Sequence, residues 1–396
     1  MICTACSCLC DDVFIEDGKV LNACKRGFEH ISKFKENRAI PRVRGGTVDV
    51  DKAIDEALEL LKSSKKPAIY GLDTSTVEAQ RLAIKIARKL GCFIDDNSSF
   101  CLGDFVEMIL RKEVPTTTLD DVRDYAYVII YWGANVYQSL PRHMSKYTYY
   151  PRGAKRNRGY DEDRYLVVVD VRKSDIAKLA KKNAKFIKVE RDLELVESFI
   201  MAAEGKAPKH IEVVEILREM KKSELNVLFG GLGLKYGLGD TKILAEMINK
   251  VNSYAPLAFL PAGFHSNMRG FNETLFEDVG FVNKFSFAEN RSDQRFAFTE
   301  LLKEEAIDCA VIVGTDPVAS LPFDISRKLA KIKTIVIDPK DTVTAKLADV
   351  VIPSAYSGIE SGGTMVRSDG VRVKLEPLEK AEIDDVYILK RILEGL

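Results

Sequence analysis

The sequence predicts an α/β protein with a small cysteine-rich lobe at its N-terminus and two related units built on open sheets. Three observations lead to this fold class. Four of the first ten residues are cysteines, and a fifth follows at Cys24. Short apolar strands alternate with amphipathic helices, a rhythm typical of open parallel sheets. A strand-and-turn pattern at 128–172 is repeated at 310–339.

Length and composition limit the class of protein. The chain has 396 residues, enough for roughly two or three domains. Its 59 basic and 59 acidic residues give a formal net charge of zero, which argues against nucleic-acid binding. No apolar run is long enough to span a bilayer, and no export signal is visible. We therefore expect a cytoplasmic protein without a membrane span, whose thiols stay reduced.

The N-terminal cysteines predict a metal centre. Cys3, Cys6 and Cys10 form a C-x2-C-x3-C run, and Cys24 completes a set of four thiols. Soft thiolates grouped in this way hold iron–sulfur clusters or zinc. Structural zinc usually takes two separate C-x2-C pairs, and this chain has one. The pattern favours a [4Fe–4S] cluster on these four cysteines, with zinc as the alternative, and leaves Cys8 as a spare thiol that could replace a neighbour.

The local patterns along the chain predict short strands and amphipathic helices. Apolar spacing indicates the helices, and turn or capping residues delimit them. We expect strands at 12–15, 19–21, 67–70 and 92–94, a turn at Asp17-Gly18, and helices at 50–63, from a cap at 74–76 to about 90, and at 383–396.

The internal repeat predicts two related binding sites. Residues 128–141 resemble 310–322, and in each copy a buried strand ends in a glycine-containing turn. A second buried strand then ends at Asp170 or Asp338, before short helices expected at 174–180 and 342–349. Ligands of open α/β sheets bind at the carboxyl ends of strands, so the two aspartates are candidates for nucleotide-like sites. The alternative is a plain turn or helix-cap role.

A basic loop occupies 151–158. It contains Arg152, Lys155, Arg156 and Arg158. The loop is interpreted either as an anion-binding or partner-contacting segment or as a solvated surface loop, and its composition favours the solvated loop.

The chain resembles molybdopterin oxidoreductases in four features. They are the cysteine run, the sequence Cys24-Lys25-Arg26-Gly27 that follows it, the turns at the strand ends and the tail at 348–353. Those enzymes hold molybdenum or tungsten on two pyranopterin guanine dinucleotides. More narrowly, the chain resembles the B subunits of formylmethanofuran dehydrogenases from methanogenic archaea. The stretches that carry the narrower resemblance are 74–80, 94–101, 131–135 with 141–144, 151–153 and 358–364.

The resemblance implies a molybdopterin-oxidoreductase-like fold. The expected parts are a [4Fe–4S] lobe at 1–45, a discontinuous pterin-binding domain at 46–138 plus 305–396, and a second pterin-binding domain at 139–304. We do not expect the C-terminal β-barrel of the wider family in this chain. The resemblance implies that a separate small subunit supplies this barrel and covers the pterins.

The resemblance also assigns roles to residues. Cys101 would be the protein thiolate on molybdenum or tungsten, and Lys25 or Arg26 would lie between cluster and pterin. Asp170 and Asp338 would contact the two guanine dinucleotides. The other expected cofactor contacts are Gly133, Asn135, His143, Arg172, Gly231, Gly314 and Asp316. Cys92 and Cys309 lie in apolar strand-like contexts and are interpreted as buried core thiols.

The chain departs from the wider family after Cys101. Many catalytic members have histidine at the next position, where this chain has Leu102. The resemblance also implies a catalytic arginine near 285–295, and the candidates are Arg291 and Arg295. His265 and Arg269 are further candidates for the lost polar roles, His265 as a catalytic residue.

The function implied by the resemblance is reversible reduction of carbon dioxide to formate, towards formylmethanofuran, in methanogenesis. Ferredoxin-type carriers would supply electrons through the cluster, and an amidohydrolase-like partner subunit would condense formate with methanofuran. The alternatives are a formate dehydrogenase-like enzyme, and a catalytically impaired paralogue that acts as a cluster-bearing scaffold subunit. A zinc-binding interaction protein would explain only the N-terminus. The sequence does not distinguish tungsten from molybdenum.

Overall fold

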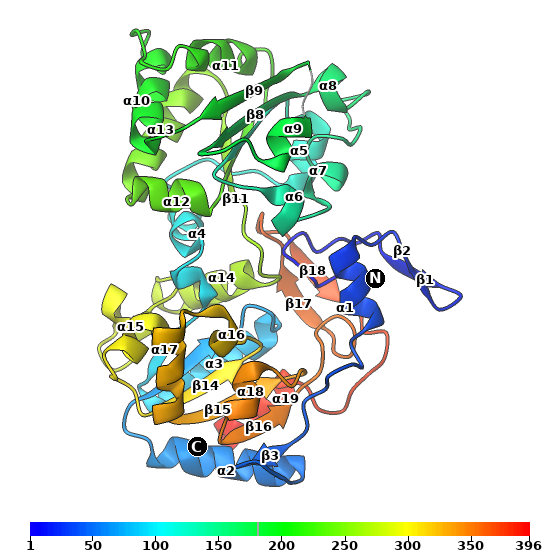
Figure 1. Ribbon diagram of the computed structural model, residues 1–396, viewed down its shortest axis with the longest axis vertical. Coiled ribbons are helices and arrows are strands. Elements are labelled where there is room, and N and C mark those ends of the chain that lie inside the picture. Colours follow the sequence, from blue (N-terminus) through cyan, green and yellow to red (C-terminus); the bar gives the residue numbers. More distant parts are fainter. Residues whose placement is uncertain (180–181) are drawn as a thin grey trace. The chain divides into compact units, whose positions relative to one another are not determined.

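The computed structural model describes residues 1–179 and 182–396 and divides the chain into two compact units (Figure 1). Unit 1 comprises 1–103, 265–367 and 372–396, and unit 2 comprises 104–264 and 368–371. The domain boundaries expected from the sequence, at 138/139 and 304/305, differ from the boundaries of these two units. They differ because the strand at 128–132 pairs within the second sheet, and the strand at 285–286 pairs within the first.

Unit 1 is built on a nine-stranded mixed sheet in the order β13-β12-β6-β5-β14-β15-β16-β3-β4. Its five central strands are parallel, and its edges are antiparallel. The central strands are β6 (Phe93–Asp95), β5 (Pro67–Gly71), β14 (Cys309–Val313), β15 (Lys333–Asp338) and β16 (Val350–Pro353). The edge strands are β13 (Arg291–Ser292), β12 (Phe285–Ser286), β3 (Arg42–Val43) and β4 (Gly46–Thr47).

Helices cover both faces of this sheet. Side chains along a strand point alternately to the two faces, so apolar residues of the same strand contribute to both cores. Ile335 and Ile337 pack into one apolar core, and Val336 packs into the other. The helices that bound the first core are α2 (Val50–Ser63), α3 (Val77–Leu90), α14 (Met268–Val279) and α19 (Asp385–Gly395). The second face carries α15 (Phe298–Lys303), α16 (Pro317–Ser320), α17 (Phe323–Ser326), η3 (Arg327–Lys331) and α18 (Val343–Leu347).

Smaller elements complete unit 1. Two hairpins and a helix lie outside the main sheet. They are β1 (Phe14–Glu16) with β2 (Lys19–Leu21), α1 (Lys25–Ser32), and β17 (Gly363–Val366) with β18 (Arg372–Leu375). The single-turn helices η1 (Asn97–Ser99) and η2 (Gln294–Phe296) follow β6 and β13.

The local predictions are largely confirmed. The helix predicted at 50–63 is α2, whose cap Asp49 accepts the amide of Lys52 at 2.7 Å. Thr76 caps α3, and Gly91 ends it in the left-handed conformation at φ 63°. The hairpin turn at Asp17-Gly18 also forms, with φ of 49° and 73°. The strand expected at 12–15 begins two residues later.

Unit 2 has five parallel strands in the order β11-β10-β7-β8-β9. Helices α10, α11 and α13 lie to one side of these strands, and α5, α7 and α9 to the other (Figure 1). The strands are β7 (Val128–Trp132), β8 (Tyr165–Asp170), β9 (Ala184–Lys188), β10 (Val227–Gly230) and β11 (Ala258–Pro261).

Helices connect the strands of unit 2. The first group is α4 (Gly103–Leu110), α5 (Leu119–Tyr125), α6 (Val136–Ser139), α7 (His143–Lys146), α8 (Tyr160–Asp163) and α9 (Asp175–Leu179). The second is α10 (Asp192–Ala203), α11 (Glu212–Met220), α12 (Leu232–Leu238) and α13 (Thr241–Tyr254). The last residue of the helix expected at 174–180, Ala180, is outside the described residues.

The two units repeat one strand plan. The central order β6-β5-β14-β15-β16 in unit 1 matches β11-β10-β7-β8-β9 in unit 2. The glycine turns have the same hydrogen bond: the amide of Gly133 donates to the carbonyl of Val169 at 2.8 Å, and that of Gly314 to Ile337 at 3.0 Å. The predicted repeat is therefore confirmed, and Asp170 and Asp338 occupy equivalent strand ends. In the part of the chain that the structure describes, every helix is too short or too polar to cross a membrane.

Candidate metal and cofactor site

The loop before β1 and the start of α1 position the N-terminal thiols. The amide of Cys3 donates to the carbonyl of Cys10 at 2.9 Å, which closes the loop on itself. Cys24 caps α1, and its sulfur accepts the amide of Gly27 at 3.4 Å. A Cβ atom on Gly27 would lie 3.0 Å from the Sγ of Cys3 and 3.8 Å from that of Cys24. The missing side chain of Gly27 therefore lets these two thiols approach one helix turn.

Cys8 takes part in the same group of thiols. It is fully buried, and it interacts electrostatically with Cys6, Cys10 and Cys24. Its hydrogen bond to Cys6 raises the pKa of Cys8 and lowers that of Cys6, while burial raises both, and the charge of Arg26 also lowers the pKa of Cys6. Lys25 is the first residue of α1 and is exposed.

The donor set suits a thiolate-bound centre. None of the eight cysteines, all of which the structure describes, forms a disulfide, and the four in the loop are buried. Soft thiolate donors favour iron–sulfur chemistry. Within the described residues, however, no three His, Cys, Asp or Glu side chains are already arranged around a metal position. The assignment of Cys3, Cys6, Cys10 and Cys24 as ligands stays a prediction.

Cys101 lies on the loop that follows β6, at the carboxyl end of the unit 1 sheet. It is 9% exposed, and its amide is held by the carbonyls of Asn97 and Ser98, both at 3.1 Å. Gly103 permits this loop to pack, because a Cβ there would lie 2.3 Å from the Nδ2 of Asn283. The sequence after β6 therefore fixes one thiol on a short, buried turn.

Buried polar groups support the Cys101 loop. The side-chain amides of Asn272 and Asn283 donate to the hydroxyl of Ser98 at 2.8 and 2.7 Å, and Ser98 donates to Asp96. Asp95 accepts the backbone amides of Lys284 and Phe298 at 3.0 and 2.8 Å. Burial raises the pKa of Asp95 to about 6 and that of Asp96 well above its usual range. Sequence reasoning missed these supporting roles, although Asp95 and Asp96 directly follow a buried strand.

His265 is the one predicted catalytic side chain that the structure brings close to this loop. Its Nδ1 lies 2.8 Å from the Oδ2 of Asp73, which also accepts the Nδ2 of Asn97 at 2.7 Å. Arg269 is buried on α14 and pairs with Glu273 at 2.7 Å.

Arg291 and Arg295 lie at a different end of the sheet. Arg291 pairs with Ser286, which pairs with Phe93, the first residue of β6, whereas Cys101 follows the last. The Arg291 guanidinium is engaged by Glu289 and Asp293 at 2.8 and 3.0 Å. The structure therefore does not bring Arg291 to Cys101.

The two strand-end aspartates differ in burial. Asp338 is 5% exposed, accepts the amide of Lys340 at 2.7 Å, and has a pKa raised by burial to about 7. Asp170 is half-buried. An ionisable carboxyl this deep at a strand end fits a buried hydrogen-bonding partner such as a nucleobase. The exposed Arg172 follows Asp170 by two residues.

The glycine and cap residues of the turns serve the chain's own backbone. A Cβ on Gly231 would lie 2.2 Å from the carbonyl oxygen of Gly133, and one on Gly314 would lie 2.3 Å from the Oγ1 of Thr74. The carboxylate of Asp316 accepts the amides of Val343 and Thr344, both at 3.0 Å. These residues have a structural reason to be present, and a cofactor contact for each stays a prediction.

Two further predicted contacts are buried. Asn135 precedes α6, and its Oδ1 is buried without a hydrogen-bond partner among the described residues. His143 is 1% exposed, with Nδ1 3.0 Å from the hydroxyl of Tyr131, and burial lowers its pKa to about 3. His143 is placed as a neutral core histidine. Cys92 and Cys309 are buried as predicted, Cys309 in β14 and Cys92 directly before β6.

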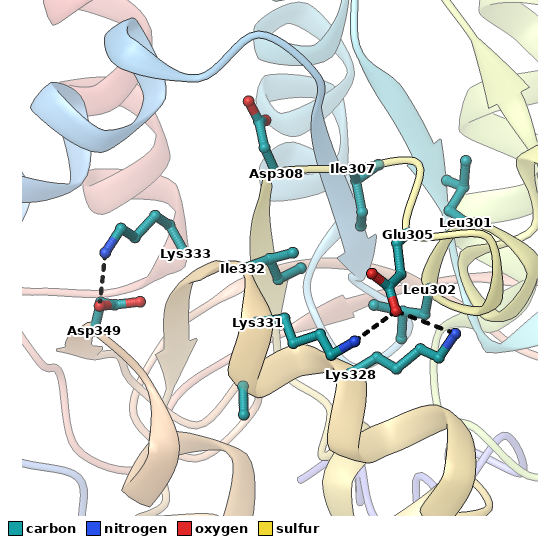
Figure 2. A pocket seen from close by; sticks show the side chains of 11 residues that line it. Leu301, Leu302, Glu305, Ile307, Asp308, Lys328, Lys331, Ile332, Lys333 and Asp349 are labelled. Atoms are coloured by element: carbon teal, nitrogen blue, oxygen red, sulfur yellow. Dashed lines mark hydrogen bonds and ion pairs between the residues drawn. The ribbon is translucent and has the colours of Figure 1, made fainter.

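Two cavities of unit 1 lie at the opposite ends of the strands. Figure 2 shows one of about 350 Å³, where Lys328 and Lys331 pair with Glu305 and Lys333 pairs with Asp349 near the start of β15. A larger cavity of about 670 Å³ is lined by Pro67 and Phe93, at or next to the starts of β5 and β6. Open α/β sheets bind ligands at carboxyl ends, so the Cys101 loop is the better candidate site.

Comparison with solved structures shows which fold the chain shares with known proteins. The chain matches a chain of the formyltransferase/hydrolase complex FhcABCD from Methylorubrum extorquens, solved with methylofuran, with a TM-score of 0.72 and 21% identity over 89% of this chain and 98% of that one. It also matches acetylene hydratase from Pelobacter acetylenicus, with a TM-score of 0.62 and 13% identity over 100% of this chain and 68% of that one. These likenesses show a shared α/β fold with open parallel sheets.

Comparison with curated sequences shows the family. The chain is 30% identical to the B subunit of the tungsten-containing formylmethanofuran dehydrogenase 2 of Methanococcus maripaludis, over 100% of this chain and 97% of that protein. The same values relate it to the protein of that name in Methanocaldococcus jannaschii. The chain belongs to the family of formylmethanofuran dehydrogenase B subunits. None of the family models compared with the chain matches it.

Proposed function

We propose that this chain is the catalytic subunit of a formylmethanofuran dehydrogenase, in which carbon dioxide is reversibly reduced to formate. The observation that carries the proposal is the retention of the N-terminal thiols and of Cys101 on a buried loop, in a chain 30% identical to tungsten-containing B subunits over its whole length. A scaffold has no physical need for these thiols. The relatives' name favours tungsten, and molybdenum takes the same ligands.

The residues present fit the expected cofactors. Cys3, Cys6, Cys10 and Cys24 would hold the [4Fe–4S] cluster, and Cys101 would bind tungsten or molybdenum. Two pyranopterin guanine dinucleotides would lie at the strand ends marked by Asp170 and Asp338, as in a molybdopterin-oxidoreductase-like fold. When bound, the metal and pterins supply two-electron redox chemistry, while the protein supplies orientation and electrostatics.

Residues of this chain would hold the metal-binding thiol of Cys101 in place. The carbonyls of Asn97 and Ser98 fix the Cys101 amide, and Asn272 and Asn283 hold the loop through Ser98. Because the loop is buried, water is excluded and nearby polar groups act strongly on developing charge.

The proposal includes partners. Ferredoxin-type carriers would supply electrons, a β-barrel subunit would cover the pterins, and an amidohydrolase-like subunit would condense formate with methanofuran. The relatives are named as B subunits of one enzyme, which supports a multisubunit complex. The free thiols suit a reducing cytoplasm.

The test is the metal content of the native complex, purified without air. About four irons and one tungsten or molybdenum per chain would support the proposal. Iron without tungsten or molybdenum would contradict it and favour the second candidate, a cluster-bearing scaffold subunit. Leu102 favours that candidate, because a buried aliphatic side chain handles no proton. Turnover of formate without any methanofuran-dependent product would instead indicate a formate dehydrogenase-like enzyme.

A further inference from the structure

Asp73 sits at the end of a strained turn close to the Cys101 loop. The strand β5 ends at Gly71 with φ 106°, and the fully buried Leu72 follows at φ 72°. A bulky residue rarely adopts this left-handed conformation, and such strain persists where the surroundings enforce it. Here the amide of Leu72 donates to Val313 at 2.8 Å, and the side chain of Gln80 donates to the Leu72 carbonyl at 2.9 Å. The turn therefore holds Asp73 in one place.

The carboxylate of Asp73 is fully buried and faces two donors. Its Oδ2 accepts the Nδ1 of His265 at 2.8 Å and the Nδ2 of Asn97 at 2.7 Å. Its Oδ1 has no hydrogen-bond partner among the residues described. Burying a carboxylate costs free energy unless hydrogen-bond donors are placed to pair with it. The hydrogen bond from His265 therefore offsets part of the cost of burying Asp73.

Asn97 connects this pair to Cys101. Its side-chain oxygen accepts the hydroxyl of Tyr70 at 2.6 Å, which fixes the amide so that Nδ2 points at Asp73. Its backbone carbonyl accepts the amide of Cys101 at 3.1 Å. One residue thus positions both the carboxylate that orients His265 and the thiol at the proposed metal.

The second copy of the strand plan lacks the arrangement. The amide of Gly231 donates to Trp132 as that of Leu72 donates to Val313, so Gly231 and Leu232 are the counterparts of Leu72 and Asp73. Leu232 is 45% exposed. The strained turn and its buried carboxylate therefore belong to the copy that carries Cys101.

We propose that His265, oriented by Asp73, is the catalytic residue that gives and takes the proton of the carbon dioxide–formate reaction, a role that Leu102 cannot fill. This inference rests on the proposed function. Forming the C–H bond of formate from carbon dioxide takes two electrons, which ferredoxin-type carriers supply, and one proton. That proton leaves Nε2 of His265. The proton on Nδ1 stays shared with Asp73, and the histidine side chain, which is 28% exposed, regains the transferred proton from solvent.

The electrostatics agree with this role. Burial lowers the pKa of His265, but the charge and hydrogen bond of Asp73 outweigh burial, so the pKa lies above its ordinary value. Tyr70 on β5 and Asp96 after β6 interact electrostatically with Asp73, and Asp95 at the end of β6 interacts with both of them. Burial raises the pKa values of all three, so a titration must be read on His265 itself.

The first test reads the histidine directly. The chain has four histidines, and burial lowers the pKa of His30 to about 4 and that of His143 to about 3. In NMR titrations of the full chain labelled at histidine, H265Q identifies the His265 signal and H210Q serves as the matched control. D73N is expected to lower the titration midpoint of His265 by about 1 pH unit or more. An unchanged midpoint would overturn the pairing.

The second test uses the complex. H265Q is expected to keep its iron and its tungsten or molybdenum, keep KM for formate, and lose about 10²- to 10⁴-fold in kcat. In formate oxidation, D73N should move the kcat limb that requires deprotonated histidine to lower pH, and H210Q should behave as wild type. Wild-type turnover in H265Q, or loss of the metal from it, would overturn the proton role alone. A wild-type complex without tungsten and molybdenum would overturn the proposed function as well.

Discussion

Gly27 and Cys3 are packed so closely that a Cβ atom on Gly27 would lie 3.0 Å from the cysteine Sγ. Fewer than one Cβ contact in ten is this short, so one of the two residues must shift if a side chain is added. Since Cys24 caps the same helix turn, the space at Gly27 governs how two predicted cluster ligands approach each other.

G27A should therefore lower the iron content of the purified protein while its melting temperature in the apo form holds or rises. Alanine stabilises a helix by about 1 kcal/mol relative to glycine. The iron content should therefore fall without a fall in the melting temperature of the apo form. G46A is the control, because a Cβ there meets only an ordinary contact of 3.5 Å. Full iron in G27A would show that the Cys3 thiol is not a ligand at this position.

C101S should remove tungsten or molybdenum from the complex and leave iron unchanged, because the proposed metal thiolate and the N-terminal thiols belong to separate loops. C309A is the matched control, since Cys309 is a buried thiol inside β14. Both metals are measured by elemental analysis after anaerobic purification. Retention of tungsten or molybdenum in C101S would withdraw Cys101 as the ligand.

D338N should change how the stability of the apo chain depends on pH. The pKa of Asp338 is raised by burial to about 7, so the folded state keeps a proton that the unfolded state releases above pH of about 4. Wild-type stability should therefore fall between about pH 4 and 7 and level off above, by an amount on the order of 3–4 kcal/mol. Asparagine does not ionise, so D338N should not show this fall in stability with rising pH. Its side-chain oxygen still accepts the Lys340 amide.

The measurement for D338N is denaturant unfolding across this pH range. D170N, at the half-buried equivalent strand end, is the control. Parallel pH curves for wild type and D338N would contradict the buried, protonated carboxyl.

R164A should destabilise unit 2 by about 3 kcal/mol or more. Arg164 is fully buried, and its guanidinium donates to the carbonyls of Val122, Ala126 and Arg123. Its removal leaves these buried acceptors unpaired. R158A, whose side chain is 74% exposed, should change stability little. Trp132 is the chain's one tryptophan and is buried in β7, so its fluorescence reports the unfolding of this unit.

Local order was predictable because it depends on neighbours in the sequence. Capping residues and apolar spacing define α2 and α3, and the repeated turns at Gly133 and Gly314 reveal the strand plan. The antiparallel edges β3–β4 and β12–β13 were not predicted, because such short strands exist only through pairing with distant segments. The expected domain boundaries differ from those of the two units for the same reason, because pairing with distant strands decides which unit a strand belongs to.

The sequence predicts the thiols of the candidate site, an assignment that stays a prediction, but it does not predict the polar network around Cys101. Cysteine spacing points to Cys3, Cys6, Cys10 and Cys24 without any structure. The pairing of Asp73 with His265 joins residues far apart in the sequence, so no local pattern signals it. The turn Gly71-Leu72 before Asp73 was a usable hint, since a buried strand ends there. His143 lies in the core beside Tyr131, and its contact with a cofactor stays a prediction.

The shared strand plan has a consequence for the chain's connectivity. In unit 2 the chain visits β7, β8 and β9 before β10 and β11, whereas in unit 1 the equivalents of β10 and β11, which are β5 and β6, come first. The two units are circular permutants of each other. Unit 2 is inserted between β6 and β14, the joint that corresponds to its own ends. Joining the ends of unit 1 and reopening it at this joint would give the chain order of unit 2 without moving a strand.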